Sequence, residues 1–161
     1  MKTRRIILSA LFAALICVAT LVIRIPLPVI GYINMGDCFV LLAGIFFGPL
    51  YGGIASGIGS AFADLISGYP IYLPFTFVIK FLMAVVISAL YKKNHNKFGY
   101  ILGGVLAELI MIVGYYLTDS MLLSSFIAAS TGIYGNSIQG LGGIIISILL
   151  FPVIKRSLKR M

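Results

Sequence analysis

Very few side chains in this sequence place a charge within its long apolar stretches, and those few could do chemistry. An unpaired charge is costly away from water, so such groups usually bind a ligand, line a cavity or neutralise one another. Six of them lie in apolar runs or at their ends: Arg24, Asp37, Asp64, Lys80, Glu108 and Asp119. Hydrogen bonding and ion pairing are the chemistry that these residue types predict.

Catalytic chemistry has little support in the sequence. The single histidine, His95, lies in a basic segment, and Cys17 and Cys38 lie in separate apolar runs. Neither a Ser–His pair nor a histidine-ligated zinc site can therefore form among the polar residues named above. The phosphate-binding pattern G-x-x-x-x-G-K-[ST] is missing as well. We expect no catalytic residue, no metal and no cofactor, and no hydrolysis of ATP by this chain.

The composition indicates whether the chain folds in water or in a lipid bilayer. Of its 161 residues 61% are hydrophobic and only 10% are charged, with a mean hydropathy of +1.13. A water-soluble domain is about a quarter charged, so these values exclude a soluble or disordered protein and favour an all-α integral membrane protein. The first apolar run, from Ile6 to Ile23, has no cleavage site after it, so we interpret it as a retained span rather than a signal peptide.

A span of the bilayer needs about 20 mainly apolar residues, and prolines and glycines show where the spans end. Turns are expected at Gly48–Pro49 and around Pro70, and a loop or kink between Ser130 and Gly135. The sequence predicts one membrane domain, residues 1–161, formed by a bundle of six transmembrane helices. They are expected near residues 6–23, 36–48, 50–67, 74–91, 99–118 and 133–153.

The basic residues predict the orientation of the bundle. All lysines and arginines except Arg24 and Lys80 fall near the N-terminus, in the segment 92–97, or near the C-terminus. With six spans these three clusters share one face, and cytoplasmic segments carry such an excess. We expect a multi-pass protein of the cell membrane with both termini in the cytoplasm, and the net charge of +8 gives no support for binding nucleic acid.

With that orientation the polar residues gather in the outer half of the membrane, and of the six only Glu108 reaches the middle. An ion path would need polar groups through the whole depth, whereas a site that captures a ligand from outside needs them on one side. Glu108, Tyr115 and Asp119 follow one helical face, and Asn136 and Gln139 lie on one stripe of the last helix.

Structural roles for the same residues remain open at this point. Asp64 with Lys80, and Asp37 with Arg24, could be ion pairs between helices. Asp119 could be a solvated helix end, and most tyrosines at this end could form an interfacial belt. The small residues of segment 50–67 predict tight packing inside the bundle. Ala10 and Ala14 form a flat strip onto which another helix could pack, whether an internal neighbour or a partner.

Several of these segments together resemble a known family. Gly31-Tyr-Ile-Asn-Met-Gly-Asp37, Gly57-Ile-Gly-Ser-Ala-Phe-Ala-Asp64 and Pro74-Phe-Thr-Phe-Val-Ile-Lys80 are similar to segments of the substrate-binding S components of energy-coupling factor (ECF) transporters. The resemblance covers essentially the whole chain. Within the family the chain looks most like members assigned to hydroxymethylpyrimidine or pyridoxine-type precursors, and its lack of tryptophan weighs against a thiamin-type pocket.

The resemblance implies a vitamin-uptake subunit that binds its ligand outside and works with a transmembrane T subunit and two cytoplasmic ATPases. It implies docking on the T subunit through Ala10 and Ala14, and leaves Arg24 and Asp64 with structural roles. The expected substrate-binding residues are Asn34, Asp37, Tyr72, Lys80, Glu108, Tyr115, Asn136 and Gln139. Among these, Lys80, Asn136 and Gln139 would hydrogen-bond the ligand, Glu108 or Asp37 would accept a hydrogen bond, and Tyr115 would stack on a ring.

Two other functions stay possible from the sequence. A stand-alone secondary transporter would need no ATPases, but it would be expected to contain an inverted repeat, which we do not find. A ligand-free structural membrane protein would use the same polar residues only to pair with one another.

Overall fold

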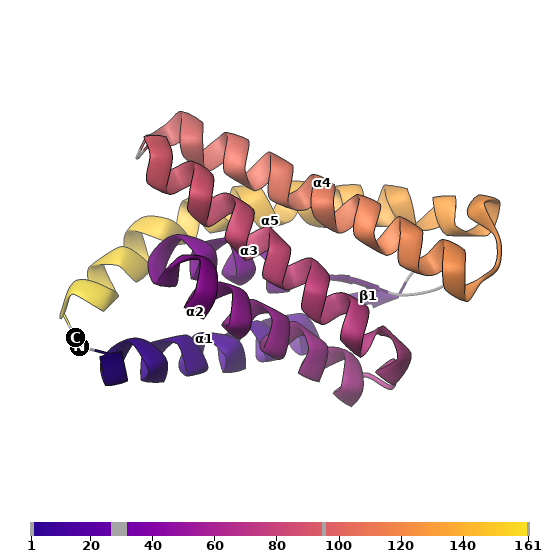
Figure 1. Ribbon diagram of the computed structural model, residues 1–161, viewed down its shortest axis with the longest axis horizontal. Helices are drawn as coiled ribbons and strands as arrows, with labels where there is room; N and C mark the ends of the chain where they lie inside the picture. The colour runs from indigo at the N-terminus through magenta and orange to yellow at the C-terminus, as the bar shows by residue number, and fades with distance from the viewer. Residues whose placement is uncertain (1, 27–31, 95, 161) are drawn as a thin grey trace.

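Apolar runs of this length fold as helices in lipid, because a helix satisfies its backbone hydrogen bonds within itself. The computed structural model describes residues 2–26, 32–94 and 96–160, and five helices within them are long and apolar enough to cross a membrane. They are α1 (Lys2–Val22), α2 (Gly36–Ile66), α3 (Leu73–Asn94), α4 (Lys97–Leu122) and α5 (Phe126–Arg160). The helices lie lengthwise along one another in a bundle (Figure 1).

Short elements close one end of this bundle. Strands β1 (Arg24–Pro26) and β2 (Tyr32–Asn34) form a two-stranded antiparallel sheet in which Arg24 pairs with Asn34. The 3-10 turn η1 (Pro70–Tyr72) leads into α3. Both lie at the end that also holds the connection from α4 to α5 (Figure 1).

Helix α2 is bent back on itself at Gly48, whose dihedral angles (φ 83°, ψ −178°) are open to glycine but not to other residues. A Cβ placed on Gly52 would lie 2.4 Å from the carbonyl oxygen of Ala43, so the two arms of α2 pack against each other next to the bend. Pro49 follows directly and begins the second arm. The reversal expected at Gly48–Pro49 is therefore present.

The expected count of six separate helices is corrected to five. Only Gly48 leaves helical dihedral angles between the expected helices 36–48 and 50–67, so no loop separates them and they form the single element α2. The last helix also differs, because α5 starts at Phe126 and runs without a break through the segment 130–135, where a loop or kink was expected. Backbone hydrogen bonding inside a helix accommodates the small residues there, although they are common in turns.

Small residues let the neighbours of α2 approach it closely. A Cβ on Gly59 would lie 2.4 Å from the backbone oxygen of Ala13 in α1, and one on Gly44 would lie 2.4 Å from that of Ala84 in α3. In lipid such close approach is the main source of packing energy, since the hydrophobic effect does not drive helices together there. The tight packing predicted for segment 50–67 is confirmed, and α2 forms the centre of the fold.

The two ends of the bundle have opposite character. Both chain ends lie at the same end (Figure 1), where Arg4 Nη2 donates to the backbone oxygen of Leu158 at 2.9 Å. The basic residues at the end of α3 and the start of α4 lie at this end too. His95 lies outside the described residues. The polar residues described next lie at the other end.

Candidate substrate-binding site

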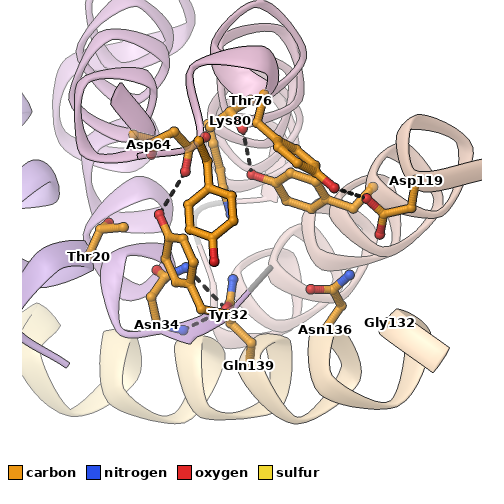
Figure 2. Close-up of a pocket in the computed structure, with 14 residues that line it drawn as sticks. Thr20, Tyr32, Asn34, Asp64, Thr76, Lys80, Asp119, Gly132, Asn136 and Gln139 are labelled. Atoms are coloured by element: carbon orange, nitrogen blue, oxygen red, sulfur yellow. Dashed lines mark hydrogen bonds between the residues drawn. The ribbon is translucent and has the colours of Figure 1, made fainter. Parts of the chain in front are cut away.

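Polar and aromatic side chains line a cavity at the end of the bundle that carries β1, β2 and η1 (Figure 2). They come from every helix, because the cavity lies where the ends of the helices meet the small sheet. The lining residues are Thr20, Tyr32, Asn34, Ser60, Asp64, Tyr69, Tyr72, Thr76, Lys80, Tyr115, Asp119, Gly132, Asn136 and Gln139.

A buried ion pair and an amide form the floor of this cavity. Lys80 Nζ pairs with Asp37 Oδ1, and the two side chains are only 3% and 1% exposed. The other Asp37 oxygen accepts a hydrogen bond of 2.6 Å from Gln139 Nε2. Gln139 Oε1 in turn accepts from the backbone N–H of Asn34 at 2.7 Å and from its side-chain amide at 3.1 Å. This network joins β2, α2, α3 and α5.

The pairing differs from both ion pairs considered from the sequence. Lys80 pairs with Asp37 and not with Asp64, and the Arg24 guanidinium lies over the Tyr32 ring, 5.6 Å from its centroid, rather than beside Asp37. The reason is geometric, because the bend at Gly48 lets the start of α2 reach Lys80 of α3, whereas Asp64 lies at the end of the second arm.

Two carboxyl groups in the walls are each held by a tyrosine. The Tyr32 hydroxyl donates to Asp64 Oδ1 at 2.7 Å, and the Tyr72 hydroxyl donates to Asp119 Oδ1 at 2.6 Å. Burial, with the Asp64 carboxylate beside it, raises the pKa of Tyr32 above its usual value, so its hydroxyl keeps its proton and remains a donor. Asp119 is 5% exposed, so it is not a solvated helix end.

Four tyrosine rings follow one another around the cavity. The ring centroids of Tyr32 and Tyr69 are 5.7 Å apart, those of Tyr69 and Tyr72 are 6.3 Å apart, and those of Tyr72 and Tyr115 are 6.5 Å apart. Lys80 Nζ lies 5.4 Å from the Tyr115 centroid. These distances suit edge and tilted contacts between rings, and they give the cavity an aromatic wall. Tyr134, by contrast, is 76% exposed and does not line the cavity.

The structure brings most of the expected substrate-binding residues to the cavity. The ones that line it are Asn34, Tyr72, Lys80, Tyr115, Asn136 and Gln139. Asp37 and Glu108 lie outside the lining set, with Asp37 in the floor network. Glu108 is buried and, within the described residues, neither of its carboxyl oxygens has a hydrogen-bond partner. A Cβ on Gly140 or Gly143 would lie 3.1 Å from a carboxyl oxygen of Glu108, so these glycines make room for it.

Sequence reasoning did not select several of the lining residues. Asp64 was given a structural role and Asp119 was interpreted as a possible helix end, yet both line the cavity. Thr20, Ser60, Thr76 and Gly132 carry no signal that separates them from ordinary packing residues. A count of the four carboxylates against Arg24 and Lys80 indicates that some carboxylates stay unpaired, but it does not select Asp64 and Asp119. Within the described residues, no three His, Cys, Asp or Glu side chains come together as a metal would require.

The strip on α1 is exposed in this chain. Ala10 and Ala14 both face outward, together with Leu11 and Val18, whereas Phe12 and Ile16 face the core. The neighbour of this strip is thus not a helix of the same bundle within the described residues.

Comparisons with known proteins identify the family. The family model described as the S component of the ECF-type riboflavin transporter matches residues 1–156. The chain belongs to the S-component family of ECF transporters. A solved structure of the S component of a bacterial ECF transporter aligns with a TM-score of 0.82 and 25% identity, over 99% of each chain. An uncharacterized protein of Pyrococcus woesei, from the 3′ region of gap, is 38% identical over 142 residues, which cover 88% of this chain and 95% of that protein.

Membership of the family establishes the general role. S components are substrate-binding subunits of transporters and not enzymes, and they are membrane proteins, in agreement with the apolar helices of this chain. For this S component the cavity at the end of the bundle is the candidate for substrate binding, because it gathers the buried polar side chains of all five helices.

Proposed function

We propose that this S component captures a small vitamin or vitamin precursor with a nitrogen-containing ring, of the hydroxymethylpyrimidine or pyridoxine type. The observation that carries the proposal is a cavity lined at once by hydrogen-bonding side chains and by four tyrosine rings. Amides, hydroxyls and carboxylates match the polar edge of such a ring, and the tyrosines match its faces. The side chains expected to bind it include the predicted residues that line the cavity, with Lys80 held in place by Asp37.

Asn136 is the side chain best prepared to bind a ligand directly. It lines the cavity from α5 and is 8% exposed, and its amide has no hydrogen-bond partner within the described residues. The amide of Gln139, by contrast, is already engaged with Asn34 and Asp37. Asn136 therefore offers both a donor and an acceptor to a ring without first losing an internal bond.

The proposal includes the direction and the energy source of transport. With the basic end of the bundle in the cytoplasm, the cavity is at the outer end, as capture from outside requires. Release to the inside is assigned to assembly with a T subunit and two ATPases, since the sequence has no ATP-binding loop of its own. A stand-alone secondary transporter is the alternative, and uptake that persists in cells without the ATPases would favour it.

The ligand is tested by binding to the purified protein. Hydroxymethylpyrimidine, pyridoxine and riboflavin, the last because it appears in the description of the family model, are compared by calorimetry and native mass spectrometry. We expect one of the single-ring compounds to bind. Asn136→Ala should weaken that binding about tenfold, the effect of one lost hydrogen bond to a desolvated partner. Tyr134→Phe on the exposed face of the same helix is the control and should leave it unchanged.

Riboflavin binding alone would keep the S-component role and replace the proposed ligand class. Binding of none of the compounds, by a protein that unfolds cooperatively, would contradict the proposal and favour a ligand-free structural role.

A further inference from the structure

Each of the two wall carboxylates is only half satisfied. Asp64 Oδ1 accepts the Tyr32 hydroxyl, but Asp64 Oδ2 is buried with no hydrogen-bond partner among the described residues. Asp119 is arranged in the same way, with Oδ1 bound to Tyr72 and Oδ2 pointing past Gly132 at 3.3 Å from where a Cβ on that glycine would be. The two side chains face the cavity from different sides (Figure 2).

The free oxygen of Asp64 is unusual, because it is buried and buried polar atoms are nearly always paired. Both aspartates are more than nine-tenths buried, at 7% and 5% exposure. The tyrosines fix each carboxylate by one oxygen, so the second oxygen has a defined direction. A group held in this way is ready to accept a hydrogen bond from a molecule in the cavity.

The charges of the residues that line the cavity also leave the two carboxylates available to a ligand. Of the described residues that line it, Lys80 is the cation, and its charge is already neutralised by Asp37 in the floor. Asp64 and Asp119 are then left without a counter-charge among the lining residues. The Arg24 guanidinium lies over the Tyr32 ring and is not part of the lining.

Among the described residues that line the cavity, no further cation faces the two carboxylates. The titratable groups that face them are Tyr32 from β2, Tyr69 and Tyr72 from the turn at η1, Lys80 from α3 and Tyr115 from α4. The tyrosines are neutral donors, and α5 contributes only Gly132, Asn136 and Gln139. Among the described lining residues, Lys80 alone brings a positive charge, so a further positive charge in the cavity would come from a ligand.

We propose that Asp64 and Asp119 determine the specificity of this site, and that they select a ring bearing N–H donors and a positive charge, such as a protonated aminopyrimidine. The inference rests on the proposed function and narrows its ligand class. A protonated ring nitrogen beside an amino group presents two parallel N–H donors, which one carboxylate can accept, and a charge-assisted bond is stronger than a neutral one. Phosphorylated forms of the same ring are excluded, because a phosphate would meet two carboxylates in a site of low dielectric.

The first test uses the unmodified protein. Affinity for hydroxymethylpyrimidine is measured by calorimetry across pH, in pairs of buffers with different ionisation heats, beside its phosphate ester and an analogue without the amino group. We expect uptake of up to one proton on binding, and affinity that falls as pH rises through the pKa of the ligand itself. The phosphate ester and the analogue should each bind at least tenfold more weakly.

The second test changes the carboxylates. Asp64→Asn and Asp119→Asn keep the size of the side chain and an acceptor for the tyrosine, so the fold is expected to survive, which thermal unfolding without ligand checks. Each should reduce affinity for the aminopyrimidine about 10- to 100-fold. Each substitution should also reduce the difference in affinity between the aminopyrimidine and its phosphate ester. The control, Tyr134→Phe, should change neither value.

The outcomes separate this inference from the proposed function. A ring ligand that binds without proton uptake and with no preference against its phosphate ester overturns the inference and leaves the proposed function standing. The same conclusion follows if both aspartate variants keep the full preference for the aminopyrimidine over its phosphate ester. Failure of every ring compound to bind overturns both.

Discussion

At the scale of single residues, the buried pair of Lys80 and Asp37 decides how the floor of the site is built. Both side chains are almost fully buried, so each charge depends on the other, and Gln139 also donates to Asp37. In such a setting the pair adds little net stability compared with apolar residues, but loss of one partner leaves an uncompensated charge. The intact pair therefore contributes to the stability of the fold and also forms part of the floor of the cavity.

Lys80→Met should destabilise the protein strongly, by about 3–5 kcal/mol, because Asp37 would remain charged and buried. Adding Asp37→Asn should recover most of the loss, since asparagine removes the charge and keeps an acceptor for Gln139. Thermal unfolding of the two single variants and the double variant measures the coupling. Additive losses in the double variant would contradict the pairing.

Sequence patterns predicted residues of the cavity better than they predicted the bonds between them. Helical spacing placed Tyr115 near Asp119, and Asn136 near Gln139, and all four line the cavity. The partner of Lys80 was not predictable, because Asp37 lies on another element and the distance between them depends on how α2 bends. The free oxygens of Asp64 and Asp119 depend on the tyrosines opposite them, which the sequence does not position.

At the scale of elements, Gly48 sets the arrangement of the bundle. The bend brings the first arm of α2 back along the second, so that Asp37 and Asp64, at the far ends of the arms, both reach the cavity. Gly48 holds a positive φ, and nothing lies within 4 Å of a Cβ placed on it, so its need for glycine is conformational and not steric. The proline after it and the short first arm made this turn predictable.

Gly48→Ala should lower stability by about 1–3 kcal/mol, the cost of holding an L-residue in a conformation that only glycine adopts readily. The matched control is Gly142→Ala in α5, which also has open space around the added methyl group but no positive φ. This control should be neutral or slightly stabilising, because alanine favours a helix. Equal unfolding temperatures for the two variants would show that the bend is not strained.

At the scale of the whole molecule, the exposed strip of α1 is the surface that we propose for docking on the T subunit. Ala10 and Ala14 are exposed, and small residues of this spacing let a second helix approach closely in lipid. The strip lies on the outside of the bundle and the cavity at its end, so the proposed docking surface is separate from the proposed ligand site.

Replacing both alanines, Ala10→Leu with Ala14→Leu, should weaken assembly with the T subunit about tenfold or more while ligand affinity stays the same. The physical reason is that leucine side chains keep the partner backbone away from α1. Co-purification with the T subunit and ATPases measures assembly, and calorimetry measures binding. The control is Ala89→Leu, an exposed alanine on α3. Full assembly of the double variant would remove this strip from the interface.

The sequence by itself determined that this is a helical membrane protein, that its basic residues share one end, and that its polar residues gather at the other. These properties follow from composition and residue order. In lipid an apolar segment must form a helix to satisfy its backbone hydrogen bonds, and charged residues lie near the ends of such helices. Only the tertiary structure decided that Lys80 pairs with Asp37, that two expected helices form one bent element, and that Asp64 and Asp119 each keep a free oxygen in the cavity. Such facts depend on distances between residues far apart in sequence, and packing at glycines such as Gly59 and Gly44 sets those distances.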